Sequence, residues 1–212
     1  MKPGQRGFGL VEMLLALSIG LALLSAASRV FVSAHETWRA QGAASRLQED
    51  ARLALLRIAQ DVRMAGMFGC LQLAPEHFED PAAQAAFAQP LMTGPDGLNL
   101  VVAQLPGMPG DPDWTLLTDC STYAQVRRGR AHGKDLAVAI SRHRYQLGGT
   151  SLMFRRGASQ QPLIDHVRDF RVALIGEGSE QHVDIQLTVF EPMLGIEQRH
   201  ALSVAVRNPV AD

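Results

Sequence analysis

An apolar run near the N-terminus constrains this chain more than any other feature. Residues 8–28 read FGLVEMLLALSIGLALLSAAS and carry a single charged side chain, Glu12. At 1.5 Å per residue, an α-helix of this length rises about 30 Å, which is enough to cross the hydrocarbon core of a membrane. Placing a carboxylate at that depth costs roughly 3 kcal/mol on insertion scales unless the carboxylate is paired. Any interpretation of the segment must therefore account for Glu12.

Two general interpretations leave Glu12 unexplained. A secretory signal peptide has a basic start and a small-residue cleavage site, but its apolar region of roughly 7–15 residues is shorter than this run. A plain transmembrane anchor fits the length, and Lys2 and Arg6 before the run favour a cytoplasmic N-terminus with the remainder exported. Neither kind of segment has a use for an acidic side chain among its apolar residues.

The order of residues at the start of the run accounts for the acid. A short basic leader precedes Gly7-Phe8, and Glu12 follows four residues after Phe8. This pattern resembles the class III signal of type IV pilins and pseudopilins. The resemblance implies that a prepilin peptidase cuts between Gly7 and Phe8, which removes residues 1–7 as a leader peptide, and that Phe8 is then N-methylated. Residues 8–28 would remain on the mature protein as a transmembrane helix that also forms the filament core.

The resemblance also implies an assembly role for Glu12. Cleavage would create a positively charged amine on Phe8, and pairing with an amine would offset the cost of a carboxylate at membrane depth. If the amine belongs to a neighbouring subunit, the pair would join subunits in register as they leave the membrane. The sequence leaves open whether Glu12 meets its own amine or that of a neighbour.

The next segment is predicted to continue as an amphipathic helix over residues 29–66. No proline occurs between Gly4 and Ala74, and apolar residues recur at spacings of three and four. These apolar residues are Leu47, Ala51, Ala54, Leu55, Ile58 and Val62. Charged residues fill much of the other face, namely Glu49, Asp50, Arg52, Arg57, Asp61 and Arg63. Two glycines predict the end of the helix near Gly66 to Gly69.

The remainder of the chain divides into two parts with different sequence patterns. Residues 67–134 hold most of the prolines and are expected to form an irregular, loop-rich insertion without a core of its own, with short strand candidates at 98–105 and 114–117. Residues 135–212 show the alternation of an antiparallel β-sheet. We therefore expect an α+β fold in which a long N-terminal transmembrane and amphipathic helix packs on a C-terminal antiparallel sheet, as in pilins.

Cys70 and Cys120 bracket the irregular region. If the domain is exported, it lies in an oxidising compartment, where a disulfide between the two cysteines is expected. If the domain is cytosolic, two unrelated buried thiols are the favoured alternative.

Sequence patterns less specific than the N-terminal motif narrow the resemblance to PilW-type minor pilins and the related J-type pseudopilins. These patterns cover residues 47–70, which run from an amphipathic helix into an Arg-Met-Ala-Gly turn and a cysteine, and the candidate strand segments 162–172 and 201–208. The resemblance implies a minor subunit that takes part in initiating pilus assembly, with roles in twitching motility and cell adhesion. Two alternatives stay open, a J-type minor pseudopilin of type II secretion and a membrane-tethered module that binds DNA or mediates adhesion.

The same resemblance implies partners and a location. The partners are other minor pilins, the major pilin, the inner-membrane assembly platform, the prepilin peptidase and a tip adhesin. The protein would first cross the inner membrane once, with a cytoplasmic N-terminus and a periplasmic C-terminal domain, and then reach the pilus at the cell surface.

Catalytic and cofactor signals are missing from the sequence. It contains no G-x-S-x-G, P-loop, H-E-x-x-H or C-x-x-C motif, so we expect neither an enzyme nor a cofactor. Asp111-Pro-Asp113 lacks the ligand count of a calcium loop and predicts a turn, so no metal is expected. Arg127-Arg128-Gly129-Arg130 is a tight basic cluster, but the net charge of −1 favours a solvated loop over nucleic-acid binding. His143, between two arginines, is expected at a strand edge.

Overall fold

The computed structural model describes residues 9–95, 97–105, 107, 110–133 and 136–208. The chain divides into two compact units, Met1–Ser45 and Arg46–Asp212, and each is described by itself. One helix, α1 (Leu10–Met64, 55 residues), supplies the described structure of the first unit except Gly9, and its residues 46–64 belong to the second. The predicted end of this helix is confirmed, because Gly66 and Gly69 follow it with φ angles of 72° and 95°.

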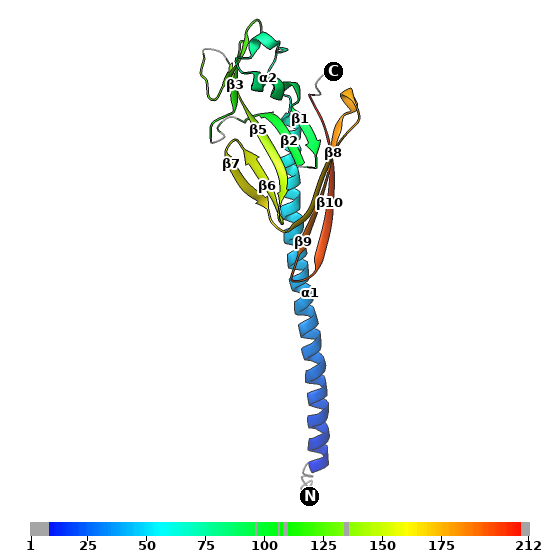
Figure 1. Cartoon of the computed structure of the whole chain (residues 1–212). Helices are drawn as coiled ribbons and strands as arrows, with labels where there is room; N and C mark the ends of the chain where they lie inside the picture. The colour runs from blue at the N-terminus through cyan, green and yellow to red at the C-terminus, as the bar shows by residue number, and fades with distance from the viewer. Residues whose placement is uncertain (1–8, 96, 106, 108–109, 134–135, 209–212) are drawn as a thin grey trace. The chain divides into compact units, whose positions relative to one another are not determined.

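After α1, the described part of the second unit contains one α-helix, two short 3-10 helices and ten strands. Most of them are labelled in Figure 1. The helical elements after α1 are η1 (Pro75–His77), α2 (Pro81–Ala88) and η2 (Gly178–Glu180). The first five strands are β1 (Leu91–Gly94), β2 (Gly97–Ala103), β3 (Trp114–Thr118), β4 (Ala124–Arg128) and β5 (Leu136–Gly148). The last five are β6 (Ser151–Arg156), β7 (Ser159–Ile164), β8 (Val167–Ile175), β9 (His182–Glu191) and β10 (Ile196–Ala205).

The strands form two antiparallel sheets rather than the one sheet expected from residues 135–212. The first is seven-stranded with the order β1-β2-β5-β3-β4, and the β6–β7 hairpin extends it from β5. The second is three-stranded with the order β10-β9-β8. The long strand β5 explains the difference, because it pairs with β2, β3 and β6 and so draws the earlier segments into its own sheet.

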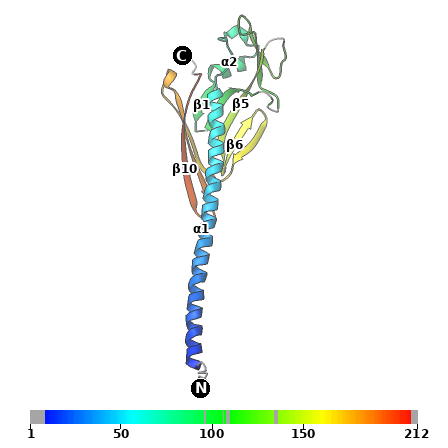
Figure 2. The ribbon, with the colours of Figure 1, turned by 180° about the vertical axis from the view of Figure 1, so that it is seen from behind.

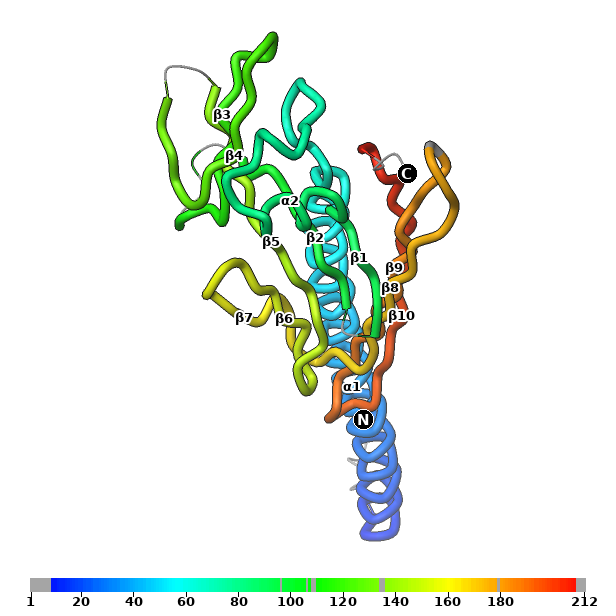
Figure 3. Tube along the Cα trace, turned by 45° about the horizontal axis from the view of Figure 1, so that its top comes forward, coloured from blue at the N-terminus to red at the C-terminus, as the bar shows by residue number. Residues whose placement is uncertain are grey.

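The helix and both sheets share one hydrophobic core. The six apolar helix residues predicted to face inward, from Leu47 to Val62, are all buried. They pack in one cluster with residues of β2, β5 and β6 from the first sheet and of β8, β9 and β10 from the second. In the backbone views, the later part of α1 lies alongside strands of both sheets (Figures 2 and 3). The α+β class predicted from the sequence is confirmed, with a long N-terminal helix followed by antiparallel β-sheets.

The segment 67–134 is more regular than the sequence predicted. The candidate strands at 98–105 and 114–117 are present as β2 and β3, and α2, β1 and β4 add further regular structure. A second buried cluster joins this segment to the first sheet, with Phe87 of α2 packed against Phe68, Phe78 and Trp114. The segment is therefore more ordered than the loop-rich insertion expected, because aromatic packing against the sheet orders it despite its prolines.

Candidate functional site

The first candidate site is the N-terminal part of α1. Among the described residues, α1 is the one helix long and apolar enough to cross a membrane, with a mean hydropathy of 2.2 in its most apolar stretch and none of that stretch buried within the chain. Its large apolar side chains are exposed, from Leu10 at 78% to Phe31 at 73%. Contact between water and an apolar surface of this length is unfavourable, so lipid or other helices must cover it. This part of α1 is therefore built to contact a membrane or neighbouring chains.

Glu12 lies in the first turn of α1 and is exposed. Among the residues that the structure describes, it has no hydrogen-bond or ion-pair partner. The first turn suits a carboxylate, because the free backbone N–H groups of a helix N-terminus carry partial positive charge. Gly7 and Phe8, the predicted cleavage and methylation positions, lie outside the described residues. The predicted cleavage and the predicted pairing of Glu12 with an amine both stay predictions.

A disulfide ties the chain after α1 to the loop after β3. Cys70 and Cys120 are bonded with their Cα atoms 5.3 Å apart, across a sequence separation of 50. Cys120 takes a positive φ of 58°, which a neighbouring turn supports. In that turn the Asp119 carboxylate accepts hydrogen bonds from the backbone N–H groups of residues 121–123 at 2.8–2.9 Å. These N–H groups, that of Tyr123 first, hold the pKa of Asp119 well below its ordinary value.

A buried polar cluster, which sequence analysis missed, lies between α1 and β5. Asp61 is 6% exposed and His143 is 2% exposed, and Asp61 Oδ2 lies 2.6 Å from His143 Nδ1. The hydroxyl of Tyr145 donates to the same Oδ2 atom at 2.5 Å. Burial first, and then the Asp61 carboxylate, raise the pKa of Tyr145 well above its ordinary value, so the hydroxyl stays protonated and donates. The cluster fixes α1 to the central strand of the sheet.

This cluster corrects two expectations. Asp61 was placed on the charged, solvent-facing side of the helix, and His143 at a strand edge, but both are buried because β5 is central and covers that side of α1. Arg57, one helical turn before Asp61, also pairs with it, with Arg57 Nε 3.6 Å from Asp61 Oδ1. No signal in the sequence links Asp61 to residues more than 80 positions away, so only the tertiary structure could reveal the cluster.

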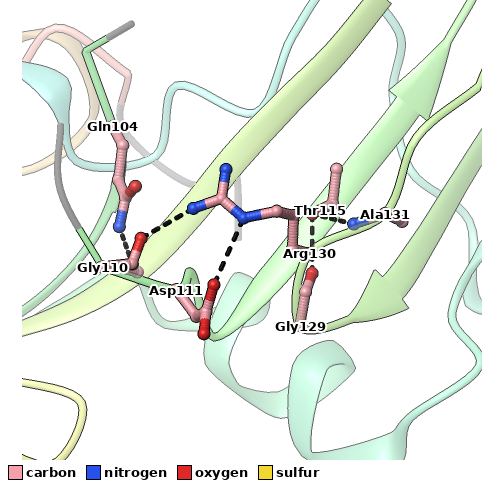
Figure 4. Close-up of polar contacts among 8 residues, drawn as sticks. Gln104, Gly110, Asp111, Thr115, Gly129, Arg130 and Ala131 are labelled. Atoms are coloured by element: carbon pink, nitrogen blue, oxygen red, sulfur yellow. Dashed lines mark hydrogen bonds and ion pairs between the residues drawn. The ribbon is translucent and has the colours of Figure 1, made fainter. Parts of the chain in front are cut away.

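The basic cluster at 127–130 is largely neutralised by the chain itself. Arg130 lies 3.2 Å from an Asp111 oxygen and donates to the carbonyl of Gly110 at 2.9 Å (Figure 4). Arg127 lies 3.3 Å from a carboxylate oxygen of Glu79. Positive charge that is already paired attracts phosphate weakly, so the geometry gives no support to a nucleic-acid site here.

The described residues contain no group of three or more His, Cys, Asp and Glu side chains that could hold a metal ion. In the Asp111-Pro112-Asp113 segment, each acid instead pairs with an arginine. Asp111 pairs with Arg130, and Asp113 pairs with Arg142 at 3.2 Å.

Comparison with known proteins supports the interpretation of the N-terminus. Comparison with curated proteins and with solved structures found no match. Residues 2–28 match the family described as the prokaryotic N-terminal methylation motif. This match agrees with the resemblance of the N-terminal segment to the signal of type IV pilin-like proteins, and the exposed apolar helix that begins at Leu10 follows it directly.

Proposed function

We propose that this chain is a minor pilin that takes part in initiating type IV pilus assembly, within a small priming complex at the tip. The observation that carries the proposal is the methylation motif over residues 2–28 on a helix whose apolar surface is exposed from its first turn. The folded unit behind that helix has its own core and a disulfide, and disulfides persist in the oxidising compartments that exported domains reach. The role is binding rather than catalysis.

The proposed mechanism is helix packing with one polar contact that sets its register. The peptidase cuts between Gly7 and Phe8, and Phe8 is N-methylated. The apolar helices of neighbouring subunits then pack side by side. Glu12 pairs with an N-terminal amine, because an unpaired carboxylate among packed apolar helices would be costly. Since a helix displaced along its neighbour would lose this pair, the pair fixes the height at which the new subunit docks.

The proposed location and partners follow from this mechanism. The precursor crosses the inner membrane once, with its N-terminus in the cytoplasm and residues after the span in the periplasm, before it enters the pilus. Its partners are the prepilin peptidase, the assembly platform, the major pilin, other minor pilins and a tip adhesin. Twitching motility and adhesion would depend on the protein through the pili it helps to start.

Deletion of the gene tests the proposal. We expect surface pili, counted by electron microscopy, to fall sharply, and plasmid-borne wild-type protein to restore them. Plasmid-borne protein with Glu12→Ala serves as the matched control and should fail to restore them. Normal piliation in the deletion strain would contradict the role in initiation.

A J-type minor pseudopilin of type II secretion is the second candidate, because the methylation motif is common to pili and secretion filaments. In that case deletion would leave pili intact and block the export of secreted enzymes. A membrane-tethered module for DNA or adhesion is the third, and normal piliation and secretion with loss of one binding activity would favour it.

A further inference from the structure

The seven-stranded sheet carries a groove on the face opposite to α1. The groove has a volume of about 630 Å³ and lies between α2, the strands β2 and β5, and the turn of the β6–β7 hairpin. One wall is apolar and includes Ala85, Ala86 and Met92, whereas three arginines line the other side. These are Arg142, Arg144 and Arg155.

The strand register places two of these arginines directly opposite each other. Arg144 of β5 is the cross-strand partner of Arg155 of β6, and Asn99 of β2 is the partner of Arg144 on its other side. The alternate residue Tyr145 packs in the core beside α1, which puts Arg144 on the outer face. Like charges directly opposite each other in an antiparallel pair are destabilising, so the chain carries a local cost at this point.

Within the part of the chain that the structure describes, no carboxylate pairs with either of these two arginines. Arg142 is satisfied, because its guanidinium lies 3.2 Å from Asp113 and over the ring of Trp114. Among the described residues, neither Arg144 nor Arg155 has a carboxylate partner. The Nε atom of Arg155 donates to the carbonyl of Gly157 at 3.2 Å, whereas the Nε atom of Arg144 is buried without an acceptor. A buried donor of a charged group that lacks an acceptor is costly, and negative charge held beside the guanidinium group would offset part of that cost.

We propose that this groove binds an acidic, extended peptide segment of a partner protein, with a carboxylate held between Arg144 and Arg155. The planar fork of a guanidinium matches a carboxylate in a bidentate pair, and two adjacent forks can hold one side chain. The apolar wall of Ala85, Ala86 and Met92 would contact the aliphatic part of the segment. The groove is open, with the Arg142 side chain 62% exposed, whereas pockets for small molecules bury most of their ligand.

This inference goes beyond helix packing and concerns the exported domain alone. It assigns that domain a class of partner, a chain with exposed glutamate or aspartate side chains. Its test does not depend on the pilus, because binding is measured on the purified full-length protein, whereas the proposed role in assembly is measured by piliation.

The test uses the full chain in detergent micelles and a fluorescein-labelled peptide of four Glu-Ala repeats, followed by fluorescence anisotropy. We expect binding that weakens by about tenfold or more in the double variant Arg144→Gln/Arg155→Gln and that falls with added salt. The peptide of four Gln-Ala repeats should not bind. The matched control Arg171→Gln/Arg199→Gln removes two exposed arginines from the other sheet and should change affinity less than about twofold.

A second variant distinguishes the loss of peptide binding from a loss of folding. Arg155→Glu would place a carboxylate beside Arg144 within the chain, so it should raise the unfolding temperature and abolish peptide binding together. Equal binding of the Glu and Gln peptides, or unchanged binding in both groove variants, would overturn the proposal. Tighter binding of a thymidine oligonucleotide or of inorganic phosphate, lost in the same variants, would also overturn it and assign the groove to phosphate.

Discussion

Glu12 shows at the residue scale how one side chain can direct the interpretation of a whole segment. Without it, the apolar run predicts an anchor and nothing more. With it, the run contains a costly group that becomes favourable only when a positive amine is near. The exposed position of Glu12 in the first turn of α1 leaves its carboxylate free to meet such an amine.

The first prediction concerns this carboxylate. Glu12→Ala should leave peptidase cleavage and membrane insertion intact but reduce incorporation into sheared filaments by about tenfold, because the pair that sets the register is lost. Immunoblots of membrane and filament fractions measure both. Gly7→Leu is the contrasting variant and should accumulate uncleaved precursor. Uncleaved precursor in the Glu12→Ala strain would show that the glutamate acts in processing instead.

Asp61 carries the second prediction at the residue scale. Asp61→Ala should lower the free energy of unfolding by about 3 kcal/mol, since it leaves the His143 ring and the Tyr145 hydroxyl buried without their acceptor. Urea unfolding followed by the fluorescence of the buried Trp114 measures the loss. Glu49→Ala is the control, because Glu49 pairs with Arg52 at the surface, and it should cost less than about 0.5 kcal/mol. A similar small loss for both variants would show that the cluster contributes little.

At the scale of elements, two connections hold the chain after α1 in place. The Phe87 cluster packs α2 on the outer face of the first sheet, and the disulfide joins the end of the helix region to the loop after β3. The disulfide closes a loop of about fifty residues, which contains η1, α2 and the strands β1–β3. Closing such a loop removes conformational entropy mainly from the unfolded chain.

The third prediction follows for Cys70 and Cys120. The double variant Cys70→Ser/Cys120→Ser should lose about 4 kcal/mol of unfolding free energy in the chain-entropy model. Urea midpoints of the two proteins measure this loss. Reductant should lower the midpoint of the wild type alone, and an equal effect on the double variant would mean that reduction acts elsewhere.

At the scale of the whole molecule, the N-terminal motif and the disulfide point to the same topology. In the proposed orientation residues 1–7 lie on the cytoplasmic side, and the Cys70–Cys120 disulfide lies in the oxidising compartment across the membrane, where disulfides persist. The fourth prediction is therefore that a phosphatase reporter, active only after export, is active when fused to the C-terminus. The same reporter fused before residue 8 should be inactive. The reverse result would contradict the proposed membrane orientation.

The sequence could predict those features that depend on local pattern. The spacing of apolar residues from Leu47 to Val62 predicted the buried face of α1, and two glycines predicted its end. Alternation over residues 135–212 predicted antiparallel strands, and β8 (Val167–Ile175) and β9 (His182–Glu191) pair in that way. Strand β7 (Ser159–Ile164) begins before the candidate segment at 162–172, and Pro162 is tolerated in it because β7 is an edge strand paired with β6.

By itself the sequence determined the N-terminal motif, the apolar run, the amphipathic helix and the α+β class, because each depends on the order of residues along a short stretch. Only the tertiary structure decided that β5 gathers early and late strands into one sheet, that Asp61 is buried against His143, and that Arg144 faces Arg155. These facts depend on which distant segments pair, and the free energy of that pairing is summed over the whole core rather than encoded at any one position.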